Sequence, residues 1–318
     1  MGSRDQRGGG SAEGGRGAAQ GEPETSAEPG LDAAAYPITH PRQSPLYHAH
    51  HADRYQRQSL IAAYEEHVDC KLVVAIDFID FDFVQNLEEH LLKEDGSREL
   101  HVLLRSPGGD GEQALRAVRS LQQRCSRLVF VIPDMAKSAA TLMALGADQI
   151  RLGPTSDLGP IDPQMQIGGR WFAAKSIMSA VQEAQTAVEH DRSLTPLWAS
   201  LLAEVTALDY QEADAEIQRT GAMVRQALGY RTDPPQGDDL ASMATTLVEE
   251  LQDTPTSHAT TMGASELRKM GLPVVDLDPC SWEWECIWRL WTSYWVQIRA
   301  PIYESTSGSY RPDGPHPA

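Results

Sequence analysis

Residues 105–109 read RSPGG and residues 136–141 read AKSAAT, and these two short stretches decide the fold. The first follows an apolar run, residues 100–104, that predicts a buried strand. The second follows a similar run, residues 128–132, and opens a predicted helix that continues through Leu145. The ends of two predicted strands therefore carry a glycine turn and a serine near a helix N-terminus.

Ser138 and two glycines are the chemical groups of interest in these stretches. Gly108 and Gly109 let the backbone turn sharply and keep side chains away from its N–H groups. Near a helix N-terminus, backbone N–H groups and the helix dipole favour a developing anion beside Ser138. The pattern predicts a hydroxyl nucleophile next to an oxyanion pocket, as acyl transfer requires. The alternative is that Ser138 only caps its helix, as serine often does.

The order and spacing of these motifs resemble the Clp-fold serine proteases, with SPGG as the oxyanion loop and the SAAT serine as the nucleophile. Residues 144–150 (ALGADQI) and 156–164 (SDLGPIDPQ) resemble the serine dehydrogenase (dehydratase) proteinase branch, related to signal peptide peptidase A. The resemblance covers residues 55–278. It implies an α/β fold, a Clp/crotonase-like β-α spiral with additional C-terminal helices, and an assembly of several copies.

The same resemblance implies an oxyanion hole made by the N–H groups of Gly109 and Ala139, with Gly108 permitting the turn. The catalytic histidine of the Clp proteases is absent, because this chain reads IDPQ at residues 161–164, where those proteases carry it. Asp162 there is predicted to form a turn, or to orient a base or bind substrate.

Two residues remain as candidate bases. Lys175 lies near the start of a predicted helix in an apolar setting, and the signal peptide peptidase relatives imply a Ser-Lys dyad, in which a desolvated lysine accepts the serine proton. The alternative for Lys175 is an ordinary helix lysine that reaches water. His258 is the second candidate, since it lies close to where Clp proteases carry their acidic triad member; the alternative is an ordinary core or surface histidine. Lys137 is adjacent to the nucleophile and predicted to bind substrate or an acidic neighbour, and His190 is a weaker candidate.

Composition excludes several functions. The 318 residues carry a net charge of −18, from 27 basic and 45 acidic side chains, which argues against binding a nucleic-acid backbone. The four cysteines form no CxxC pair, so neither a metal nor another cofactor is predicted. No apolar run reaches the roughly 18 residues of a membrane span, and no secretory signal is recognised, which predicts a cytoplasmic protein.

Three regions are expected along the chain: a disordered leader at 1–45, the protease domain at 46–278, and a Trp-rich extension with a loose tail at 279–318. In the extension, Trp284, Trp288, Trp291 and Trp295 share one face of a predicted helix, which either binds a partner or packs on its own core. Helices are predicted at 56–67, 81–92, 111–122, 138–145, 171–190, 194–208, 211–229, 238–251 and 264–270, and strands at 72–75, 100–104, 128–132, 150–152 and 273–277.

These observations predict a serine endopeptidase that cleaves a protein or peptide substrate through an acyl-enzyme at Ser138. Lys175, or else His258, would take and return the proton. Two other functions stay open: a catalytically inactive scaffold or binding subunit of the same fold, and a crotonase-like acyl-CoA enzyme, which shares the oxyanion geometry.

Overall fold

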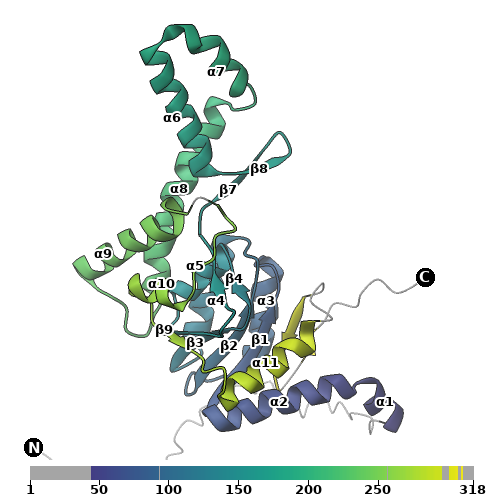
Figure 1. The fold of residues 1–318 in the computed structure, drawn as a ribbon. Coiled ribbons are helices and arrows are strands. Elements are labelled where there is room, and N and C mark those ends of the chain that lie inside the picture. Colours follow the sequence, from purple (N-terminus) through teal and green to yellow (C-terminus); the bar gives the residue numbers. More distant parts are fainter. Residues whose placement is uncertain (1–43, 93, 256, 296–300, 307–308, 311–318) are drawn as a thin grey trace, which may run out of the picture. The chain divides into compact units, whose positions relative to one another are not determined.

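The computed structural model describes residues 44–92, 94–255, 257–295, 301–306 and 309–310. The chain divides into two units, Met1–His50 and His51–Ala318. In the first unit the described part holds helix α1 (Pro45–His50). The predicted leader lies almost entirely outside the described residues. All other elements belong to the second unit (Figure 1).

A seven-stranded sheet forms the centre of the second unit, in the order β11-β10-β1-β2-β3-β5-β9. The five strands from β1 to β9 are parallel, and β10 and β11 extend the sheet antiparallel beyond β1. Their bounds are β1 (Cys70–Ile76), β2 (Glu99–Arg105), β3 (Arg127–Ile132), β5 (Gln149–Leu152), β9 (Val274–Asp276), β10 (Ile302–Glu304) and β11 (Ser309–Tyr310). The apolar runs that predicted the five parallel strands are confirmed. No strand was predicted at 302–304.

Helices cover both faces of this sheet (Figure 1). In β1, Val73 and Ala75 pack into one apolar cluster while Leu72 and Val74 pack into the other, because neighbouring strand residues point to opposite faces. The first cluster includes residues of α3 (Phe81–Leu91), α4 (Gly111–Gln122), α5 (Ala139–Leu145), α8 (Ala207–Leu228), α9 (Gly237–Val248) and α10 (Ala264–Lys269). The second includes α2 (Ala52–Val68) and α11 (Trp282–Trp295). The predicted α/β fold class is confirmed.

One predicted helix begins later than expected. The range 171–190 contains the end of a hairpin, β7 (Gln164–Ile167) with β8 (Arg170–Ala173), before helix α6 (Ala174–His190). Gly168 and Gly169 form the turn with φ of 58° and 79°. Two adjacent glycines between short strands are a hairpin signal that the helical reading overlooked.

A second predicted helix is interrupted. The range 194–208 ends as α7 (Thr195–Leu201), after a short 3-10 turn η2 (Arg192–Leu194), and α8 starts at Ala207. Thr206 begins α8 because its hydroxyl accepts the Asp209 N–H while the Asp209 side chain accepts the Thr206 N–H. This capping box separates two helices that the apolar pattern had joined. Past α9, a π-helix η3 (Glu249–Asp253) completes the predicted helix at 238–251.

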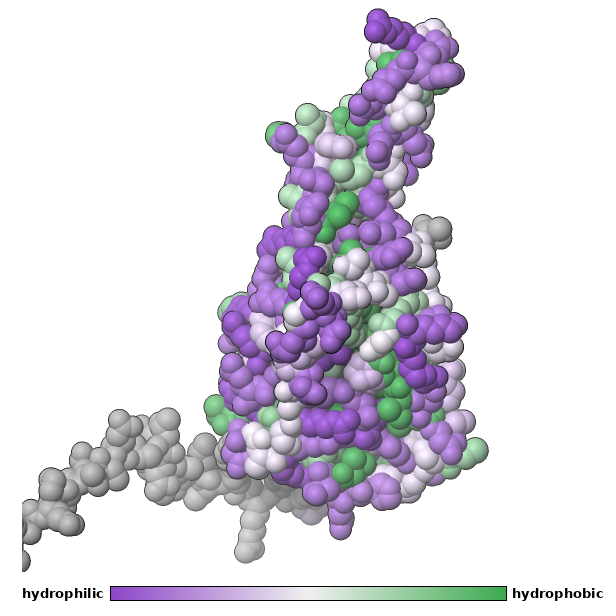
Figure 2. Space-filling view, turned by 90° about the vertical axis from the view of Figure 1, so that its left-hand side faces the viewer, coloured by the Kyte–Doolittle hydropathy of each residue, from purple (hydrophilic) through white to green (hydrophobic). Residues whose placement is uncertain are grey.

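The tryptophan helix α11 divides its aromatic side chains between core and solvent. Trp284 and Trp291 are buried in the second apolar cluster, whereas Trp288 is 42% exposed and Trp295 57% exposed. One pair therefore packs on the protein's own sheet, as one of the two readings predicts, and partner binding by the exposed pair stays a prediction. Hydrophilic residues predominate on the face drawn in Figure 2, and apolar patches interrupt them. Within the described residues, no helix has the length and apolarity to cross a membrane.

Candidate active site

Ser138 occupies a strained turn between a strand and a helix. Its φ of 51° and ψ of −119° lie in a region that residues with a side chain rarely adopt. The serine is the N-cap of α5, yet its side chain makes no capping hydrogen bond, and its own N–H donates to the Pro160 carbonyl at 3.0 Å. The hydroxyl is therefore not used as a helix cap, contrary to the structural alternative for this residue.

The glycine loop after β2 allows the backbone to pass directly beside this serine. A Cβ at Gly108, whose φ is 111°, would lie 2.7 Å from Ser138 Cβ. A Cβ at Gly109, whose φ is 147°, would lie 2.1 Å from the Ile79 carbonyl oxygen. Only glycine fits both positions, because the contact distances and the backbone conformation each exclude a side chain. The RSPGG motif is thus explained by close approach to the serine turn.

Two backbone N–H groups at this turn are left without acceptors. The Gly108 N–H donates to the Ser106 hydroxyl at 3.1 Å. Among the described residues no acceptor binds the N–H of Gly109 or of Ala139, and both residues line the same pocket as Ser138. Amide donors that lack an acceptor beside a nucleophile are suited to hold a developing oxyanion.

A histidine and a buried aspartate meet at the edge of this pocket. His258 Nδ1 lies 2.8 Å from Asp162 Oδ1, although the two residues are 96 positions apart in the chain. Asp162 is 1% exposed, and its other oxygen accepts a hydrogen bond from Gln164 Nε2 at 2.7 Å. Because a carboxylate only accepts, the Nδ1 of a neutral His258 ring carries the proton, which leaves Nε2 with a lone pair.

His258 is open to the pocket on its other side. Its side chain is 35% exposed, and Nε2 has no partner among the described residues. No hydrogen bond joins it to the Ser138 hydroxyl within that part of the chain, although both residues line one pocket. Such contacts are often long in ligand-free enzymes and shorten when substrate binds.

The pocket has a volume of about 590 Å³ and lies at the carboxyl ends of the parallel strands. Leu142 and Met223 contribute apolar surface to its lining, and Glu112 and Glu216 contribute carboxylates. Both carboxylates pair with Arg219, which also lines the pocket.

The other candidate base is placed elsewhere. Lys175 does not line this pocket, and its Nζ donates to the backbone carbonyls of Gln252 at 2.8 Å, Asp253 at 3.4 Å and Pro255. The structure therefore brings Ser138, His258, Gly109 and Ala139 together but does not bring Lys175 to them.

Lys137, Asp148 and His190 have structural partners or lie outside the pocket. Lys137 forms an ion pair with Asp157, which fits the acidic neighbour expected for it. Asp148 accepts the N–H of Leu128 at 2.8 Å and thereby ties two strands at one end of the sheet. His190 is the last residue of α6 and does not line the Ser138 pocket.

Gln164 also belongs to the site, although the sequence analysis named it only as part of the IDPQ motif and gave it no role. It contacts Asp162 and lies 3.4 Å from His258 Nδ1. The only local signal was its place in the IDPQ motif. The described residues gather no group of three or more His, Cys, Asp or Glu side chains suited to a metal ion.

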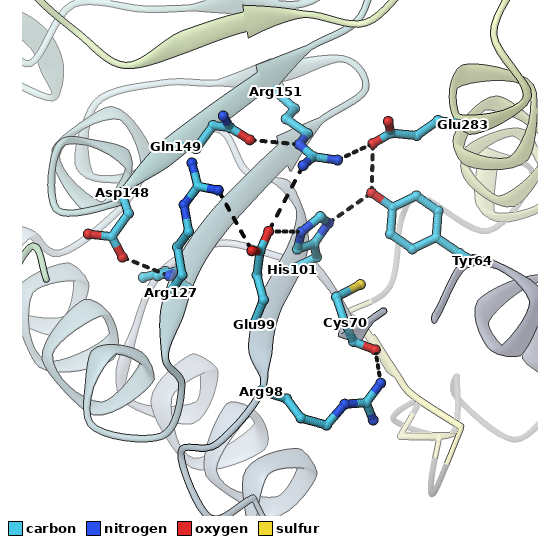
Figure 3. Close-up of polar contacts among 11 residues, drawn as sticks. Tyr64, Cys70, Arg98, Glu99, His101, Arg127, Asp148, Gln149, Arg151 and Glu283 are labelled. Atoms are coloured by element: carbon cyan, nitrogen blue, oxygen red, sulfur yellow. Dashed lines mark hydrogen bonds and ion pairs between the residues drawn. The ribbon is translucent and has the colours of Figure 1, made fainter. Parts of the chain in front are cut away.

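A second polar cluster, which we call the buried network, lies on the other side of the sheet from α4 and α5 and is drawn in Figure 3. His101 is fully buried, with Nδ1 2.8 Å from the Tyr64 hydroxyl and Nε2 2.7 Å from Glu99 Oε1. Burial lowers the pKa of His101 to about 4. Arg151 and Tyr64 both contact Glu283 at the start of α11, so the network joins the sheet to α2 and α11.

The parallel sheet, with a glycine loop and a strained serine turn at its strand ends, defines an α/β protein. Residues 73–205 match the family model described as ClpP-like SDH-type serine proteinase. The resemblance predicted from the SPGG, SAAT, LGAD and LGPIDPQ motifs is confirmed.

Two curated relatives match over part of their length. The uncharacterized protein MJ0137 of Methanocaldococcus jannaschii is 30% identical over 97 residues, covering 30% of this chain and 32% of that protein. The uncharacterized protein MJ1495 of the same organism is 27% identical over 130 residues, covering 39% of this chain and 42% of that protein. The chain thus spans less than half the length of either relative.

Solved structures give weaker similarity. A mutant of the 1510-N membrane-bound stomatin-specific protease, in complex with a substrate peptide, has a TM-score of 0.41 at 16% identity, covering 65% of this chain and 75% of that one. ClpP1 from Listeria monocytogenes has a TM-score of 0.38 at 12% identity, covering 68% of this chain and 97% of that one.

Proposed function

We propose that this protein is a serine peptidase that hydrolyses peptide bonds through an acyl-enzyme at Ser138. The observation that carries the proposal is one pocket that contains a serine free of capping bonds, two amide N–H groups without acceptors in the described part of the chain, and a histidine held by a buried carboxylate. The match to a serine proteinase family supports the reaction class. A cytoplasmic location and an assembly of several copies belong to the same proposal.

Each group has a defined role in this reaction. Ser138 Oγ attacks the scissile carbonyl carbon while His258 Nε2 accepts its proton. The carbonyl oxygen becomes an oxyanion that the N–H groups of Gly109 and Ala139 stabilise. His258 then donates the proton to the leaving amine, and a water molecule, activated by the same nitrogen, hydrolyses the acyl-enzyme. Asp162 accepts a hydrogen bond from the Nδ1–H group, which keeps the proton on Nδ1 and leaves Nε2 free to act as the base.

His258 is favoured over Lys175 as the base because of where the two side chains lie. His258 lines the Ser138 pocket with a ring nitrogen that has no partner among the described residues, whereas Lys175 directs its ammonium to three backbone carbonyls. Accepting the serine proton requires a lone pair in the pocket of the hydroxyl, and of these two described side chains the histidine is the one that lines that pocket.

One observation favours a second candidate, a binding subunit without activity. Ser138 and His258 share a pocket but no hydrogen bond joins them in the described structure. If the contact does not form when a peptide binds, the pocket would hold the peptide without cleaving it.

Labelling with a fluorophosphonate probe, followed by peptide mapping, separates these two functions. We expect the full-length protein to be labelled at Ser138 and the Ser138→Ala variant to be unlabelled. Ser176→Ala, a change at an exposed serine on α6, is the matched control and should label like the wild type. A folded wild-type protein that takes up no probe, alone or with added peptide, would favour the binding subunit.

A further inference from the structure

Lys175 makes a polar contact between α6 and the segment that carries His258. A lysine ammonium has three N–H donors. In this structure three backbone carbonyls, those of Gln252, Asp253 and Pro255, accept from Nζ. All the donors are therefore used within the protein, and none is left for the serine pocket.

These three carbonyls belong to the end of a helix, where a cation is a favourable hydrogen-bond donor. They lie at and just beyond the end of the π-helix η3, which continues α9. The last carbonyls of a helix have no intrahelical partner and carry partial negative charge. Lysine side chains commonly satisfy such carbonyls. Pro255 has no N–H with which to continue the helix, so the chain leaves the helical path at this point.

The segment that begins there carries His258 and is bound to the Asp162 region on both sides. Upstream, the Ile161 N–H donates to the Leu251 carbonyl at 2.9 Å. Downstream, Leu158 and Met262 exchange two backbone hydrogen bonds of 3.0 and 2.9 Å. Between these attachments, the Lys175 ammonium contacts the carbonyls at the point where the chain leaves the helix towards His258.

The start of α6 is connected to the carboxylate as well. The Ala174 N–H donates to the Pro163 carbonyl at 2.9 Å, and Pro163 directly follows Asp162. Two adjacent residues of α6 thus hold the two partners of the His258–Asp162 pair, Ala174 through Pro163 and Lys175 through the end of η3.

We propose that Lys175 is a positioning residue, whose ammonium clamps the end of η3 and thereby sets the place of His258 relative to Asp162 and Ser138. This inference rests on the proposed function. It assigns the lysine a role as hydrogen-bond donor, in place of the proton-accepting role that the sequence suggested.

Three variants of the full-length protein test the proposal. Lys175→Met removes the cation and keeps the length and apolar stem of the side chain. Lys175→Arg keeps a cation with several N–H donors but cannot act as a base near neutral pH. Lys269→Met, which removes an exposed lysine at the end of α10, is the matched control.

The first measurement is the rate of fluorophosphonate labelling as a function of pH. A displacement of His258 by about 1 Å predicts a 10- to 100-fold slower rate for Lys175→Met, since small misplacements of reacting groups have effects of about that size. We expect Lys175→Arg to label within about threefold of the wild type, with the midpoint of its pH profile unchanged. If Lys175→Arg is as inactive as Lys175→Met, the lysine is the base and the proposal is wrong.

The second measurement does not depend on activity. Amide hydrogen exchange should be at least about tenfold faster in Lys175→Met at the Thr254 and Met262 N–H groups, which bond to Glu249 and Leu158. Unchanged exchange in Lys175→Met would overturn the clamp. If the wild type fails to label while exchange accelerates as expected, the clamp stands and the proposed peptidase function fails.

Discussion

Two histidines of this protein, His258 and His101, each pair with a carboxylate at nearly the same distance but lie in opposite surroundings. The His258–Asp162 contact is 2.8 Å and the His101–Glu99 contact is 2.7 Å. His101 is fully buried with both ring nitrogens bonded, as Figure 3 shows. His258 is 35% exposed, and its second nitrogen faces a pocket of about 590 Å³ that also contains Ser138.

The difference teaches that a histidine–carboxylate pair does not by itself indicate catalysis. In the buried network the second nitrogen is occupied by Tyr64, so the pair connects the sheet to α2 and α11. In the pocket the second nitrogen of His258 lacks a protein partner among the described residues, which leaves it open to the proton transfer proposed above. The unpartnered nitrogen and the neighbouring serine are the features on which the proposed role of the His258 pair rests.

The largest expected effect comes from exchanging the functional histidine. His258→Asn should slow fluorophosphonate labelling of Ser138 by about 10³-fold, because loss of the base leaves only binding and the oxyanion donors. Its melting temperature should change little, since the side chain is partly exposed. His101→Phe should do the reverse, lowering the melting temperature while folded molecules label at the wild-type rate. Equal loss of labelling in the two variants would show that the two histidines do not have different roles.

Next in size is the glycine loop of the pocket. Gly109→Ala should destabilise the fold by about 4 kcal/mol, because the added Cβ meets the Ile79 carbonyl and the φ of 147° is unfavourable for alanine. Gly169→Ala is the control, since its φ is 79° but no atom lies within 4 Å of the new Cβ. It should cost only about 1 kcal/mol of backbone strain. Urea unfolding measures both, and similar losses would show that steric contact at Gly109 is unimportant.

The buried histidine should make stability depend on pH. Because burial lowers its pKa from 6.5 to about 4, the unfolded chain binds the proton first as the pH falls. The stabilisation is complete above pH 6.5 and is lost progressively down to about pH 4, a decrease of about 3 kcal/mol. Urea unfolding at a series of pH values should show this slope in the wild type and a smaller slope in His101→Phe. Identical slopes would mean that the pKa of His101 is not lowered by folding.

The smallest effect is expected at the helix side of the buried network. Glu283→Gln weakens the contacts with Arg151 at 2.5 Å and Tyr64 at 2.9 Å, and Glu283 is 24% exposed. We expect a loss of about 1 kcal/mol in the free energy of unfolding, because solvent reduces the strength of a partly exposed pair. Labelling of Ser138 should not change. A change in labelling would show that the network and the pocket are coupled.

Much of the pocket could be predicted from local sequence. Glycine is required at both positions of RSPGG because a Cβ there would collide with Ser138 or Ile79. The serine turn follows an apolar strand. Local steric rules recognise both features. The hairpin at Gly168 and Gly169 was also visible locally, and its misreading as helix was avoidable.

The partners of the serine could not be predicted in the same way. Asp162 and His258 are 96 residues apart, and neither stretch has a spacing that requires them to meet. Lys175 seemed a candidate base because its neighbours in the sequence are apolar, but carbonyls 77 or more residues further along the chain occupy its ammonium. Only the fold determines such long-range contacts.

The sequence by itself determined the parallel sheet, the class of fold and the serine turn, because apolar periodicity and the conformational freedom of glycine act between near neighbours. The tertiary structure decided which histidine faces the pocket, which one is buried, and where the lysine is held. Those assignments depend on burial and on hydrogen-bond partners that folding brings together from distant parts of the chain.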